Sequence, residues 1–278
     1  MSFPIIDAHQ HFWIYDPLRD GWITEEMKSL QRDFLPPDLE PVFNENLISG
    51  SVVVQSDQSA AENLFQLNLA ANHSFIKGVV GWVDLQSPFL EEQLIDYKRF
   101  PKLKGFRHVL QGEQPRDRML LPAFQRGIGL LNQYEYSYDL LILPDQLAFA
   151  EKLVAAFPEQ RFVIDHLAKP FIRSGEIAEW YSDILRFAKY PQVYCKISGM
   201  VTEADWRNWQ KEDFHPYLDA VLDAFGTKRI MFGSDWPVCL LAGSYREMKD
   251  IVSDYFSSFT VTEQSDFFSG NAMRFYQL

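Results

Sequence analysis

Short apolar runs recur along the chain, and longer stretches with apolar residues at helical spacing lie between them. Eight runs have the length and the β-branched content of buried strands: residues 4–12, 50–55, 78–85, 104–110, 138–143, 161–167, 193–199 and 229–236. The intervening stretches predict helices at residues 59–73, 87–99, 121–134, 144–158, 174–190, 213–226 and 244–256. Ser59 is placed to cap the first of these helices, and Gly226 is placed to end the sixth.

Strands that alternate with helices and reach eight in number are typical of a closed parallel barrel. We therefore predict an α/β fold in which residues 1–278 form a single domain, a distorted (β/α)8 TIM-type barrel. The segment 14–47 carries four prolines and several aromatic residues, which makes it too irregular for an ordinary barrel loop and too aromatic for a flexible linker. This segment predicts an irregular lid over the active site, following the first strand.

Charge and cysteine content narrow the class of function. The formal net charge is −12, so the average surface repels phosphate backbones and anionic lipids, and neither a nucleic-acid nor a membrane partner is expected. Two cysteines are too few for a disulfide framework, and no apolar run approaches the roughly 20 residues of a membrane helix. Without a signal-peptide pattern, the expected location is cytoplasmic, and a homo-oligomer is compatible with the sequence.

The polar residues at the ends of the predicted strands are the candidates for chemistry, because barrel enzymes place their active sites there. His9 and His11 end the first strand one residue apart, so their side chains point to the same face. His166 ends the sixth strand and Asp235 ends the eighth. Since barrel closure makes the first and eighth strands neighbours, we expect Asp235 to lie beside the two histidines.

Two kinds of chemistry suit these four residues. Imidazole nitrogens and a carboxylate are ligands that a zinc-like ion prefers, so His9, His11, His166 and Asp235 can hold one divalent metal ion such as zinc. The same set can also act without a metal, with the imidazoles stabilising an oxyanion and Asp235 taking a proton from water. The sequence leaves both routes open.

Four motifs resemble the amidohydrolase superfamily: DAHQHFW at residues 7–13, IDHLAKP at 164–170, FGSDWP at 232–237 and GNAMRFY at 270–276. The similarity is closest to its branch of sugar-acid lactonases and 2-pyrone-4,6-dicarboxylate hydrolases. It implies that Asp235 activates water and that His9, His11 and His166 complete the catalytic set. The fourth strand, KGFRHVL, has no bridging lysine or glutamate, and the fifth has no histidine, so at most one metal ion is expected.

The resemblance also implies substrate-binding residues. In the lactonase branch, basic residues at the positions of Arg107, His108 and Lys196 would hold oxygens of the substrate. Arg107 and His108 are consecutive, so only one of them faces the barrel interior, and we favour Arg107 because a guanidinium matches pairs of oxygens. Trp236, next to Asp235, is expected to line the site.

These residues predict a hydrolase that acts on a carboxylic ester and opens the lactone ring of a sugar acid, similar to L-fuconolactone or L-rhamnonolactone. Its partner would be this small-molecule substrate. One alternative is a metal-dependent decarboxylase of an unsaturated or aromatic acid. A second alternative is a barrel that binds a metabolite without turnover, which would show Asp235 blocked or turned away from the histidines.

Overall fold

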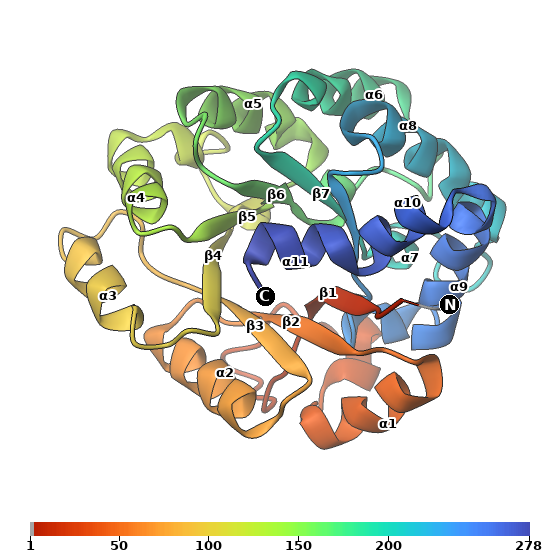
Figure 1. Cartoon of the computed structure of the whole chain (residues 1–278), viewed down its shortest axis with the longest axis horizontal. Coiled ribbons are helices and arrows are strands. Elements are labelled where there is room, and N and C mark those ends of the chain that lie inside the picture. The colour runs from red at the N-terminus through yellow and green to blue at the C-terminus, as the bar shows by residue number, and fades with distance from the viewer. Residues whose placement is uncertain (1–2) are drawn as a thin grey trace.

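The computed structural model describes residues 3–278, and eight parallel strands surround a common axis in it (Figure 1). The strands follow chain order around the sheet, from β1 to β8, as the sequence predicts. Their bounds are β1 Ile6–Gln10, β2 Gly50–Val54, β3 Ile76–Gly81, β4 Leu103–Val109, β5 Ser137–Leu141, β6 Phe162–Ile164, β7 Val193–Ile197 and β8 Ile230–Phe232. The predicted (β/α)8 barrel is confirmed.

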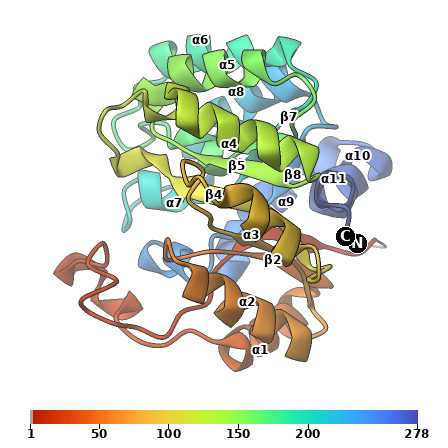
Figure 2. The same ribbon diagram turned by 90° about the vertical axis from the view of Figure 1, so that its left-hand side faces the viewer.

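Helices cover the outside of the barrel (Figures 1 and 2). Their bounds are α1 Pro36–Asn46, α2 Ala60–Asn72, α3 Leu90–Tyr97, α4 Pro122–Gln133, α5 Leu147–Ala156, α6 Ala178–Leu185, α7 Met200–Glu203, α8 His215–Phe225, α9 Tyr245–Tyr255, α10 Val261–Ser265 and α11 Asn271–Tyr276. The Ser59 hydroxyl accepts the Glu62 backbone N–H and so caps α2, and Gly226 follows the last residue of α8 with φ +60°. No helix within residues 3–278 has the length and apolar character that crossing a membrane requires.

Helix α1 is a difference from the sequence prediction. We expected the prolines of segment 14–47 to keep it irregular, but Pro36 and Pro37 occupy the first turn of α1. A first-turn residue has no intrahelical partner for its N–H, so proline is tolerated there. The Asp38 carboxylate accepts the Leu35 N–H at 2.9 Å and supports this start.

The barrel closes between β1 and β8 through backbone bonds near the carboxyl ends of the strands. The His11 N–H donates to the Trp236 carbonyl at 2.7 Å, and the Asp235 N–H donates to the His9 carbonyl at 2.8 Å. Below this seam, the buried Asp7 carboxylate accepts bonds from Ser234 and so ties β1 to the segment after β8. These bonds place Asp235 beside the histidine pair, as predicted.

Helix α11 closes the opposite end of the barrel and lies across its centre in Figure 1. Phe275 and Tyr276 pack into the apolar interior of the barrel together with Ile6, Val52 and Met231. Both chain ends lie on this side, whereas α7 and the segment between β1 and α1 lie on the other side (Figure 2). The carboxyl ends of the strands are therefore the end left for a site.

The predicted lid is a loop whose ends are paired through Trp13 and Phe34, and we call this pairing the lid neck. Trp13 and Phe34 exchange two backbone hydrogen bonds, at 3.0 and 2.9 Å, and their rings pack edge to face. The Trp13 indole N–H also donates to the Arg32 carbonyl at 2.8 Å. Residues 14–33 thus form a loop with paired ends, and this loop contributes side chains to the cavity described below.

Candidate active site

Three histidines and one aspartate meet at the carboxyl ends of β1, β6 and β8. Oδ1 of Asp235 lies 3.3 Å from Nε2 of His11 and 3.8 Å from Nε2 of both His9 and His166. The Nε2 atoms of His9 and His11 are 3.2 Å apart. All four residues are at most 5% exposed, so the structure brings together every catalytic candidate that the sequence predicts.

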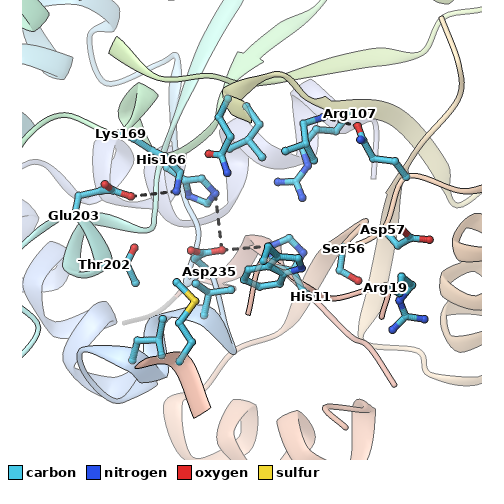
Figure 3. A pocket seen from close by; sticks show the side chains of 18 of the residues that line it. His11, Arg19, Ser56, Asp57, Arg107, His166, Lys169, Thr202, Glu203 and Asp235 are labelled. Carbon is cyan, nitrogen blue, oxygen red and sulfur yellow. Dashed lines mark hydrogen bonds and ion pairs between the residues drawn. The ribbon is translucent and has the colours of Figure 1, made fainter. Parts of the chain in front are cut away.

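The backbone after β6 and β8 leaves the strand conformation earlier than the sequence suggests. Residues 166–169 all have φ between +52° and +57°, and Asp235 has φ +58°. A left-handed conformation costs a non-glycine residue roughly 1–2 kcal/mol, and such strain is concentrated at functional sites. It turns the His166 and Asp235 side chains toward each other at the end of the barrel (Figure 3).

Hydrogen bonds to the Nδ1 atoms orient the histidines. His11 Nδ1 lies 2.8 Å from the Val54 carbonyl oxygen and therefore carries a hydrogen that it donates. His166 Nδ1 lies 2.9 Å from the Ser198 hydroxyl, and His9 Nδ1 lies 3.3 Å from Oδ1 of Asp165. With the Nδ1 atoms engaged in this way, the Nε2 atoms face Asp235.

The pKa values favour an ionised Asp235 and neutral imidazoles at His9 and His166. Burial lowers the pKa of His166 to about 4, against the attraction of Asp235, and burial together with Lys196 lowers the pKa of His9 well below its usual value. Burial also opposes ionisation of Asp235, but the neighbouring His166 and His11 side chains outweigh it and lower its pKa. At neutral pH the site offers a carboxylate and neutral His9 and His166.

This donor set fits one divalent metal ion. His9, His11 and Asp235 each offer a ligand atom, and these atoms lie within 4.8 Å of one another. His9, Asp165 and His166 form a second group of this kind, but Asp165 is already bound by Lys196 at 3.0 Å and Arg107 at 3.2 Å. Those two cations oppose a second ion at Asp165.

Lys196 lies beneath the histidines and does not reach the cavity that we expected it to line. Its Nζ is fully buried and lies 2.6 Å from Oδ2 of Asp139, 3.0 Å from Oδ1 of Asp165 and 3.1 Å from His9 Nδ1. The Tyr276 hydroxyl donates to the same Asp139 oxygen at 2.8 Å. Because two carboxylates hold Lys196 inside the barrel, its place is one of support for His9 and not of contact with a ligand.

Arg107 and His108 point to opposite sides of β4, as strand alternation requires. Arg107 lines the cavity, and its guanidinium donates to Asp165 and to the Gln55 carbonyl. His108 instead accepts the Trp82 indole N–H at 3.2 Å and lies 2.9 Å from Glu113, outside the cavity lining found within residues 3–278. The preference for Arg107 over His108 agrees with this geometry.

Trp236 is also absent from the cavity lining of the described residues, contrary to expectation. The left-handed turn at Asp235 directs that carboxylate to the cavity and sends the next side chain into the core. There the Trp236 ring packs against Phe12 and Phe34, with centroids 6.0 and 5.3 Å apart, and is 3% exposed. Through its contact with Phe34, Trp236 thus supports the lid neck.

The cavity above the histidines has a volume of about 460 Å³. Lys169 and Glu203 line one part of it, and Arg19, Ser56 and Asp57 line another (Figure 3). Sequence reasoning missed these five residues because they lie in loops or, for Glu203, in a short helix after the strands, and no local pattern reveals the paths of these segments. The one available signal was for Lys169, which lies three residues after His166 in the IDHLAKP motif.

Residues 6–278 match the family described as amidohydrolase. The chain belongs to the amidohydrolase family. An L-fucono-1,5-lactonase of Burkholderia multivorans is 39% identical to it, over 98% of this chain and 96% of the relative. An L-fucono-1,5-lactonase of Burkholderia ambifaria is 35% identical, over 98% of this chain and 95% of the relative.

A crystal structure of an amidohydrolase from Burkholderia multivorans contains bound zinc. It is 40% identical to this chain, covers 99% of both chains and superposes with a TM-score of 0.95. This amidohydrolase chain therefore shares its whole fold with an experimentally determined, zinc-containing relative.

Proposed function

We propose that this amidohydrolase hydrolyses the lactone of a sugar acid, with an L-fuconolactone-like or L-rhamnonolactone-like substrate. The observation that carries the proposal is the Asp235 carboxylate, 3.3 Å from His11 Nε2 at the floor of a cavity large enough for a sugar ring. Two L-fucono-1,5-lactonases among the relatives support the substrate class. Asp235 faces the histidines, whereas a non-catalytic barrel was expected to have it turned away.

Asp235 is the base of the proposed reaction. Its carboxylate takes a proton from the attacking water, and the same group returns that proton to the ring oxygen as the ester C–O bond breaks. The low pKa of Asp235 makes it a weak base for ordinary water. A divalent ion at these residues supplies the required polarisation of water and carbonyl when it is bound.

The other residues bind and orient. His9, His11 and His166 would hold the metal ion, and Asp235 would complete the ligand set. Arg107 presents its guanidinium to the oxygens of the substrate, while Asp165 fixes that guanidinium from behind at 3.2 Å. Lys196 and Asp165 together hold the Nδ1 side of His9, which keeps the Nε2 atom directed at the reacting centre.

The proposal is tested with Asp235→Asn, which keeps the size of the side chain and removes the base. Hydrolysis of L-fucono-1,5-lactone, followed with a pH indicator, should fall by a factor on the order of 10²–10⁴. Asp145→Asn, in an exposed ion pair with Arg116, is the matched control and should retain activity. Metal content and circular dichroism are measured for each variant.

Near-normal turnover by a folded Asp235→Asn protein would remove Asp235 as the base. If the wild-type protein releases CO₂ from aromatic acids and opens no lactone ring, the lactonase proposal itself is wrong.

A further inference from the structure

Three cations line the cavity, and each is paired with a carboxylate. The Arg19 guanidinium binds Asp20 through two bonds, at 2.9 and 2.7 Å. Arg107 binds Asp165, as described above. The third cation, Lys169, lies 3.1 Å from Oε1 of Glu203. Among residues 3–278, the cavity lining thus offers a ligand no Arg or Lys side chain that lacks an anionic partner.

Glu203 differs from the other two anionic partners in its position. Asp20 and Asp165 are 3% and 0% exposed and lie behind their cations, outside the cavity lining. Glu203 itself lines the cavity, with a quarter of its side chain exposed, and lies beside Lys169 on the same side of the cavity in Figure 3. Unlike Asp20 and Asp165, Glu203 is thus itself accessible from the cavity.

The backbone holds both partners of this pair in place. Lys169 ends the left-handed turn that begins at His166, and its N–H donates to the His166 carbonyl at 2.7 Å. Glu203 ends α7, and its carbonyl accepts the Arg173 N–H at 2.9 Å, which connects the loop after β6 to the loop after β7. The pair is a built feature of the cavity wall and not a chance contact between flexible side chains.

We propose that Glu203 is a specificity-determining residue, which pairs with Lys169 and restricts the cavity to sugar lactones whose remaining substituents are uncharged. A carboxylate on the ligand would need a cation, and the nearest candidate on this wall is already neutralised. It would also be repelled by Glu203, since like charges at close range disfavour binding. Hydroxyl groups, by contrast, can donate to Glu203 and accept from Lys169.

This inference rests on the proposed lactone hydrolysis for its substrate class, but its first test needs no turnover. Calorimetry measures the Kd of two open-chain acids of the same sugar series, L-fuconate with one carboxylate and galactarate with two. Glu203→Gln should improve galactarate binding relative to L-fuconate by about tenfold, the size of a modest charge interaction at a partly exposed site. All proteins are compared at equal metal content.

Two further variants show whether the effect passes through Lys169. Lys169→Met leaves Glu203 uncompensated and should weaken galactarate binding relative to L-fuconate. The double variant Lys169→Met/Glu203→Gln should lose the gain of the single Glu203→Gln change. Glu151→Gln is the matched control. It removes a carboxylate on α5 that is paired with Lys189, and the variant should behave as wild type.

The kinetic arm uses three 1,5-lactones of one stereochemical series in which C6, the substituent on C5, is a methyl, hydroxymethyl or carboxylate group. Glu203→Gln should narrow the ratio of kcat/KM between the methyl and the carboxylate lactone by about tenfold. An unchanged ratio of Kd values in Glu203→Gln, or a gain that survives in the double variant, overturns the proposal. Absence of all lactone hydrolysis would instead refute the proposed function, while the binding comparison still decides the role of Glu203.

Discussion

At the scale of single residues, a few side chains and one glycine determine the geometry of the site. Gly199 follows β7 with φ +62°, and a Cβ atom there would lie 2.6 Å from His166 Nδ1 and 3.2 Å from Oδ2 of Asp235. Any side chain at this position would displace the two residues that the proposed chemistry needs. The glycine is therefore required by space as well as by backbone conformation.

Gly199→Ala should fold with reduced stability and lose most of its lactonase activity. The left-handed backbone costs alanine roughly 1–2 kcal/mol, and the clash with the imidazole displaces His166. Gly226→Ala is the control for positive φ without a clash: it has φ +60°, with ψ −177° where Gly199 has ψ 12°, and no atom lies within 4 Å of the added Cβ. Denaturant unfolding should show a loss of stability for both variants, while kcat/KM falls only in Gly199→Ala. Equal activity in the two variants would contradict this account.

At the scale of elements, the contacts at the lid neck hold the lid in place. The Trp13–Phe34 pairing closes the ends of loop 14–33, and the Trp236 ring packs against Phe34 beneath it. The loop supplies Arg19, Trp22 and Met27 to the cavity. Local opening of this loop therefore changes the cavity without requiring the barrel to unfold.

Trp13→Phe should loosen the lid more than it destabilises the barrel. It keeps an aromatic ring in the core but removes the indole bond to the Arg32 carbonyl, which is worth roughly 0.5–1.5 kcal/mol. Limited trypsin cleavage within residues 14–33 should become faster, and KM for the lactone should rise. Trp209→Phe, which removes a similar indole bond to the Ala242 carbonyl, tests whether the effect is local. If trypsin cleaves both variants at the same rate within residues 14–33, the lid neck does not control the opening of the lid.

At the scale of the whole molecule, buried charges join distant parts of the chain. Asp7 on β1 accepts bonds from Ser234 after β8 and from the Tyr245 hydroxyl on α9. Lys196, Asp139 and Tyr276 likewise connect the barrel interior to α11. Burial raises the pKa of both Asp7 and Asp139 to about 6. These carboxyl groups make stability depend on pH.

For Asp7, the direction in which stability changes with pH follows from its raised pKa in the folded state. The contribution of Asp7 to the free energy of unfolding is fully present below its unfolded pKa, which is near 3.8. It is lost as the pH rises through the folded pKa of about 6, and the total loss is up to about 3 kcal/mol. Asp7→Asn removes this dependence because the amide does not ionise. Denaturant unfolding with a chelator present, from pH 4 to pH 7, should show the variant gaining stability relative to wild type as the pH rises. A constant difference across this range, or the same trend in the exposed control Asp96→Asn, would contradict the assignment.

The sequence by itself determined the barrel and the grouping of the four candidate catalytic residues. Strand and helix periodicity reflects burial on one face of each element, and residues that end parallel strands must meet at one end of a closed barrel. His9, His11, His166 and Asp235 could therefore be brought together without coordinates. The order of the strands gave Asp235 its neighbours, although more than two hundred residues separate it from His11.

Only the tertiary structure decided which side chains line the cavity. Three predicted residues stand next to or among site residues in the sequence, yet each takes another direction. His108 points to the outer side of β4, two carboxylates hold Lys196 inside the barrel, and Trp236 turns into the core. Lys169 and Glu203 come from different loops, and only the left-handed turn after β6 and the short helix after β7 bring them within 3.1 Å. Local patterns record which face is buried, whereas loop paths depend on contacts between residues far apart in the chain.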